Sequence, residues 1–110
     1  MSLQSLILSL ISEIKDPAIR NDIASTIYFI RDLYMDNKIN DEQLQSDLTE
    51  IIDTVVSAVY PDLIGEAKLK KVEELTQQFM RAIKLETLRA RQLRRQFGRL
   101  RLSMSGMGTE

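Results

Sequence analysis

One long segment without proline, from Asp62 to Leu102, sets the strongest constraint on how this chain folds. Its apolar residues recur every three or four positions, which is the spacing of one face of an α-helix. A helix that starts between Asp62 and Glu66 and ends near Leu102 is about 57 Å long at about 1.5 Å per residue. The helices expected before it reach only about 20–30 Å. A bundle can therefore cover only the first half of the long helix. The second half must project, fold back at a break such as Gly98, or pack on another chain.

The residues before this segment predict three shorter helices, over about 2–15, 17–36 and 41–59. Asp16 is suited to cap the second helix, and Pro17 fits its first position because no N–H is needed there. Asn40 and Gln43 have the spacing of a capping box at the start of the third helix. The expected core faces consist of Leu3, Leu6, Ile7, Leu10, Ile11 and Ile14; Ile19, Ile23, Ile27, Ile30 and Tyr34; Leu44, Leu48, Ile51, Ile52, Val55 and Val59; and, on the long helix, Leu69, Val72, Leu75, Phe79, Ala82 and Ile83.

The predicted fold class is all-α, a helical bundle of four helices in which three short antiparallel helices are joined by one long C-terminal helix that extends beyond the bundle. A chain of 110 residues fits one domain. We expect a single helical domain over residues 1–102, with an acidic three-helix part over 1–61 and the long basic helix over 62–102. The small, glycine-containing end predicts a flexible tail over 103–110.

Charge is divided unevenly between the two parts of the chain. Residues 1–66 carry twelve acidic and four basic residues, whereas residues 67–110 carry eleven basic and four acidic residues. Six arginines occur without any lysine or acid in the stretch RARQLRRQFGRLRL: Arg89, Arg91, Arg94, Arg95, Arg99 and Arg101. The use of arginine without lysine favours bidentate contacts with phosphate. Each such phosphate contact releases counterions. We therefore expect these arginines to contact a polyanion, with nucleic acid bound without sequence preference as the favoured partner.

An apolar seam runs between the arginines. It consists of Ala90, Leu93, Phe97 and Leu100, at spacings typical of a heptad repeat, although it covers barely two heptads. An apolar seam on a helix that overruns its bundle must be covered by another surface. The sequence thus predicts a homo-oligomer, with a dimer as the favoured stoichiometry.

Three other partners fit the same basic helix. A basic amphipathic helix can lie on an anionic membrane surface, which the shortness of the seam disfavours. It can also pair with an acidic protein surface, as in an adaptor or assembly subunit. That surface can belong to the same chain or a neighbouring copy, where acidic residues recur at helical intervals: Asp22, Asp32, Asp47, Glu50 and Asp53. The overall pI of about 5.5 and the scarcity of aromatic residues count against nucleic acid.

The composition argues against catalysis. The chain has no histidine and no cysteine, which removes the commonest general base, the commonest metal ligand and any disulfide. No motif for nucleophilic catalysis, phosphate binding or metal ligation occurs. We expect no catalytic residues, no metal and no cofactor. The remaining catalytic alternative is an anion clamp of Arg81, Lys84 and Arg91 with Glu86, although Glu86 is explained more simply by a helix pair with Arg89.

The sequence also bears on where the chain resides. It has no apolar run of about 20 residues, and its first residues lack the basic start and cleavage site of a signal peptide. With no cysteine framework to indicate an oxidising compartment, we expect a cytoplasmic protein.

Overall fold

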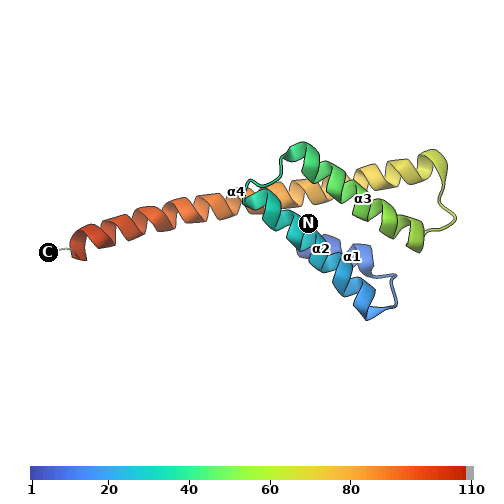
Figure 1. The fold of residues 1–110 in the computed structure, drawn as a ribbon, viewed down its shortest axis with the longest axis horizontal. Coiled ribbons are helices and arrows are strands. Elements are labelled where there is room, and N and C mark those ends of the chain that lie inside the picture. The colour runs from blue at the N-terminus through green and yellow to red at the C-terminus, as the bar shows by residue number, and fades with distance from the viewer. Residues whose placement is uncertain (109–110) are drawn as a thin grey trace.

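The computed structural model of the protein describes residues 1–108, with side chains as far as Arg101. It contains four helices: α1 (Leu3–Ile11), α2 (Pro17–Met35), α3 (Asp41–Val59) and α4 (Gly65–Gly108) (Figure 1). No strand occurs among residues 1–108, and the predicted all-α bundle of four helices is confirmed.

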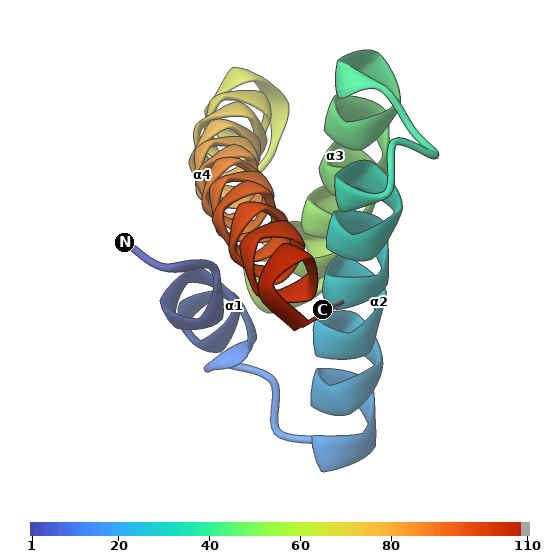
Figure 2. The same ribbon diagram turned by 90° about the vertical axis from the view of Figure 1, so that its left-hand side faces the viewer.

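The helices form a short bundle around the first half of α4. Helix α2 runs antiparallel to α3, and α3 runs antiparallel to α4, while the short α1 lies against α2 and α4 (Figures 1 and 2). The second half of α4 continues out of the bundle, which gives the molecule extents of 69 × 28 × 22 Å. Of the three arrangements that the sequence left open, the single chain adopts the projecting one.

The helix starts follow the local signals in the sequence. The Asp16 carboxylate accepts a hydrogen bond from the Ala18 N–H at 2.9 Å, and Pro17 follows it as the first helical residue. At the start of α3, the Asn40 side chain accepts from the Gln43 N–H at 2.9 Å, and the Gln43 side chain accepts from the Asn40 N–H at 3.0 Å. Both predicted caps are confirmed. Caps can be predicted from the sequence because they depend only on residues within one helical turn.

Two helix ends differ from the prediction. Helix α1 ends at Ile11, not near residue 15, although Ile14 still packs against the core from the following turn. Helix α4 passes through Gly98 and continues to Gly108, beyond the expected end near Leu102. A single glycine costs about 1 kcal/mol in a helix interior, which the arginine and leucine neighbours offset through their high helix propensity. The structure thus extends the helix into the segment 103–110 expected to be a flexible tail, of which residues 109–110 lie outside the described residues.

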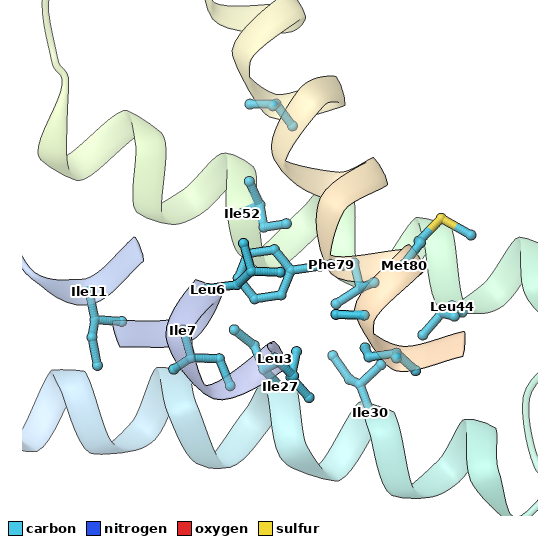
Figure 3. Packing of buried hydrophobic residues seen from close by; sticks show 14 of the residues in the cluster. Leu3, Leu6, Ile7, Ile11, Ile27, Ile30, Leu44, Ile52, Phe79 and Met80 are labelled. Atoms are coloured by element: carbon cyan, nitrogen blue, oxygen red, sulfur yellow. The ribbon is translucent and has the colours of Figure 1, made fainter. Parts of the chain in front are cut away.

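Phe79 lies at the centre of the hydrophobic core (Figure 3). It is fully buried and belongs to one cluster with residues of all three other helices, among them Leu3, Ile27 and Ile52. Two residues expected in the core, Ile19 and Leu69, are exposed. Both lie in the first two turns of their helices, and periodicity alone does not show where the packing partner ends.

Three buried residues of α4 were not among the predicted core residues: Thr76, Met80 and Thr87. They widen the buried face of the helix on one side. The Thr87 hydroxyl donates to the Ile83 carbonyl at 2.8 Å, which satisfies this polar group inside the core. Among the described residues, no helix combines the length and the apolar character needed to cross a membrane.

Candidate functional site

Helix α4 leaves the bundle beside the turn between α2 and α3. Glu86 accepts from Arg31 of α2 at 3.3 Å, and Lys84 forms an ion pair with Asp41 of α3 at 3.1 Å. The last contact is a hydrogen bond of 2.8 Å from Arg91 to the side chain of Asn37 in the turn. We call residues 89–108 of α4 the arm; its base is held by this turn.

The turn that holds the arm is itself well defined. Asn37 has a φ of 60°, the left-handed conformation that asparagine adopts more readily than most residues. Next to it, the Tyr34 hydroxyl donates to Asp41 at 2.8 Å. Burial and the bond to Asp41 raise the pKa of Tyr34, and the hydrogen bonds from Tyr34 and Lys84 lower the pKa of Asp41. The base of the arm is therefore a network that includes α2, α3 and α4.

All six arginines predicted to bind a polyanion lie on the arm and are exposed. Arg91 bonds to Asn37, but no side chain of residues 1–101 forms an ion pair or hydrogen bond with the other five: Arg89, Arg94, Arg95, Arg99 and Arg101. The acids of the bundle that do form ion pairs do so with Arg31, Lys68 and Lys84. In a single chain, the acidic half therefore does not neutralise the arm.

The apolar seam is largely exposed. Leu93, Phe97 and Leu100 are 66%, 58% and 57% exposed, and only Ala90, at the base, is half-buried. Phe97 follows Phe79 by about five full turns at 3.6 residues per turn, so the two rings lie on the same side of α4. The seam thus continues the core-facing stripe of α4 into the part of the helix that the other three helices no longer cover.

The arginines occupy the sides of the arm that the seam does not. At about 100° per residue, Arg94 and Arg101 lie beside the seam and Arg89 lies on its other flank, whereas Arg91, Arg95 and Arg99 lie on the opposite side. A partner that covers the seam therefore leaves arginines accessible on the outer surface of the arm.

The residues considered for an anion clamp do not form one site. Arg81 lines a hollow beside α1 together with Met1 and Leu85, whereas Arg91 lines a different hollow at the α2–α3 turn. Glu86 pairs with Arg31 of α2, and the predicted helix pair with Arg89 is not formed. No group of three or more potential metal ligands occurs within the described part of the chain.

Comparison with models of protein families, with characterised proteins and with solved structures finds no match for this chain. The fold and the site therefore define the class of protein by themselves: an all-α helical bundle that carries a cationic, apolar-seamed arm.

Proposed function

We propose that this protein is a non-catalytic interaction protein that binds a polyanion, with the nucleic-acid backbone as the favoured ligand, through the arginines of its arm. The observation that carries the proposal is that Arg89, Arg94, Arg95, Arg99 and Arg101 are exposed and without an ion pair among the described side chains. Guanidinium groups on several sides of a rod suit contacts with phosphates, which fix position without reading sequence.

The distance of the arm from the bundle supports this function. Residues 1–88 carry fifteen acidic and nine basic residues, a net charge of −6 that repels a polyanion. Arg99 and Arg101 lie about 12–15 Å beyond Arg91 along the helix axis. This exceeds the Debye length of about 8 Å at physiological salt. The outer arginines are thus screened from the acids of their own bundle.

Self-association through the seam is the second part of the proposal. Leu93, Phe97 and Leu100 expose a continuous apolar edge that a second copy of the same edge covers, as in a short coiled coil. The arginines on the opposite side stay free in such a pair, so self-association and polyanion binding are compatible on one helix.

The function is tested by fluorescence anisotropy with labelled DNA and RNA oligonucleotides of unrelated sequence across a salt series. We expect binding that weakens steeply with salt, because each neutralised phosphate contributes a slope of about −0.7 to −0.9 in log K against log salt. The variant R94Q/R95Q/R99Q/R101Q should reduce that slope by about 3.

A matched control carries the same charge change on the bundle. Lys15, Lys38, Lys70 and Arg81 are exposed and form none of the ion pairs of the described residues. The variant K15Q/K38Q/K70Q/R81Q should therefore keep the slope of the unmodified protein. Equal loss of slope in both variants, or no binding at low salt, contradicts the proposal.

An acidic protein surface is the alternative partner. This alternative is favoured because the seam and the arginines lie on the same helix. Cationic amphipathic helices with this arrangement bind in apolar grooves that are rimmed by acidic residues. Polyglutamate, which offers carboxylates without phosphates, separates the two functions. Tighter binding of polyglutamate than of DNA at equal charge concentration would favour the protein partner.

A further inference from the structure

Two hollows lie beside α1, where it packs against the bundle part of α4 (Figure 2). The wider hollow has a volume of about 360 Å³, and Arg81, Ala82 and Leu85 of α4 line it. The narrower hollow, of about 130 Å³, lies where α1 meets α3 and α4. Leu6 and Gln78 line both hollows, which therefore join into one groove along α4.

The floor of the narrow end is aliphatic. The aliphatic residues that line it are Leu6, Leu10, Val55, Val56 and Leu75. Leu6, Val55 and Val56 are buried, whereas the polar lining residues Ser9 and Gln78 are exposed and form the rim. A helix of about 10–12 Å diameter is too wide for this end of the groove. A single alkyl chain fits it and would be removed from water against the floor.

The charged side chains that line the groove are both positive. Arg81 lines the wide end and Lys71 the narrow end, and no acidic side chain of the described residues lines either. The bundle as a whole is acidic, with fifteen acidic and nine basic residues over 1–88. The Lys71 ammonium lies 5.1 Å from the centre of the Tyr60 ring. Arg81 is exposed and forms no ion pair within residues 1–101, so it is the cation available to an anionic group.

We propose that this groove binds a medium-chain alkyl carboxylate, with the carboxylate at Arg81 and the alkyl chain in the narrow end. A guanidinium group can donate two parallel hydrogen bonds to one carboxylate. Arg81 and Lys71 are about 15 Å apart along the axis of α4, which is comparable to an extended dodecanoate. The aliphatic floor disfavours sugars and nucleotides, because their polar groups would be left without partners there. This site is separate from the arm and goes beyond the proposed function.

The alkyl part of the proposal is tested by isothermal titration calorimetry on the full chain with hexanoate, octanoate and decanoate. Concentrations below micelle formation keep the ligand monomeric, so that binding to a lipid surface does not contribute. We expect the affinity to increase by up to about fourfold for each added methylene that is buried in the groove. An affinity that does not increase with chain length overturns the proposal.

The carboxylate part is tested by Arg81→Gln. This variant should bind decanoate about tenfold more weakly, the effect expected for a lost hydrogen bond to a charged group, and should bind uncharged decanol as before. Lys70→Gln is the matched control, because Lys70 is an exposed cation of α4 that lines neither hollow. Equal affinity of R81Q and the unmodified protein for decanoate contradicts the proposed site.

The narrow end is tested by Ser9→Phe. Ser9 is exposed at the rim, so the phenyl group can enter the hollow without replacing a core residue. The variant should keep its thermal unfolding transition and lose most of the dependence of affinity on chain length. Leu8→Phe is the control, since Leu8 is its exposed neighbour on α1 and lines neither hollow. The same loss in both variants, or no loss in S9F, refutes the placement of the alkyl chain.

The arm is a competing site, because it also combines arginines with exposed apolar residues. The variant R94Q/R95Q/R99Q/R101Q should bind decanoate as the unmodified protein does. In methyl NMR spectra, decanoate should shift the signals of Val55 and Val56 and leave those of Leu93 unchanged. Loss of binding in the arm variant, or shifts at Leu93 alone, would place the carboxylate on the arm and overturn the proposal. None of these measurements involves nucleic acid, so their failure is distinct from a failure of the proposed function.

Discussion

Tyr34, Asp41 and Lys84 connect three helices at the base of the arm. The Tyr34 hydroxyl and the Lys84 ammonium both contact the Asp41 carboxylate, at 2.8 and 3.1 Å. The carboxylate therefore fixes α2 and α4 relative to the start of α3, next to the turn that receives Arg91. These contacts link α2, α3 and α4 at the point where the arm leaves the bundle.

The contribution of the Tyr34–Asp41 hydrogen bond should depend on pH. The pKa of Asp41 is lowered in the folded state, so its stabilising effect is present at neutral pH and is lost as pH falls below about 4. The pKa of Tyr34 is raised, so its effect is lost as pH rises above about 10. Urea unfolding of Tyr34→Phe and the unmodified protein should differ most at pH 6–8, and the difference should shrink as pH falls below about 4. A difference that does not change with pH would assign the effect to packing.

Two phenylalanines on the same side of α4 should differ sharply in their importance for folding. Phe79 is fully buried, and Phe79→Ala should lower the free energy of unfolding by about 3–5 kcal/mol. Phe97 is 58% exposed, and Phe97→Ala should change the stability of the monomeric bundle by less than about 0.5 kcal/mol. Urea unfolding at low protein concentration measures both values. Similar losses in the two variants would show that the arm packs on its own bundle.

Each helix depends on a different balance of local and tertiary interactions. Helix α3 begins with a reciprocal capping box and buries Leu44, Leu48 and Ile52 against the core. The arm has neither a buried face nor a cap among its described residues, so its helicity depends on the propensity of its arginine, glutamine and leucine residues. The arm is therefore the element in which a single glycine matters most.

Two glycine-to-alanine substitutions in α4 should have opposite effects. An added Cβ at Gly98 meets nothing within 4 Å, so Gly98→Ala should stabilise the arm helix by about 1 kcal/mol. Gly65 has a φ of +64°, where an alanine is strained, so Gly65→Ala should destabilise the protein by about 1 kcal/mol or more. Amide hydrogen exchange within the arm reports the first effect, and thermal unfolding reports the second. Slower exchange of arm amides in G65A and not in G98A would refute this assignment.

Helix existence and helix starts could be read from the sequence, because periodicity and caps depend on residues a few positions apart. Contacts across the bundle could not be predicted in this way. Glu86 pairs with Arg31 fifty-five positions away, and no local signal prefers it to the neighbouring Arg89. The exposure of Leu69 likewise depends on where another helix ends. The spacing of Phe79 and Phe97 already places both rings on the same side of α4. That Phe79 is buried and Phe97 exposed could not be predicted, because it depends on where the bundle ends.

The hydrophobic core and the arginine-rich stretch occupy different parts of the molecule along its long axis. The buried apolar residues all lie between Leu3 and Ile83, whereas the arginine-rich stretch begins at Arg89. The acidic and basic parts of the chain therefore correspond to a folded body and its extension. A substitution in one part should leave the task of the other largely unchanged.

Removal of the arm tests this separation. A chain of residues 1–91 keeps the core cluster and the hydrogen bond between Arg91 and Asn37. It should retain a cooperative thermal transition within a few degrees of that of the full chain, and it should lose nucleic-acid binding. Circular dichroism and fluorescence anisotropy measure the two properties. A molten or unfolded 1–91 chain would show that the arm is required for folding.

Because the helix that passes through the core is the same helix that forms the arm, no break in α4 separates the arm from the bundle between Gly65 and Gly108. A ligand bound near the end of the arm would therefore be kept at a fixed distance and orientation relative to the bundle. Rotation of the bundle would then rotate the bound ligand with it.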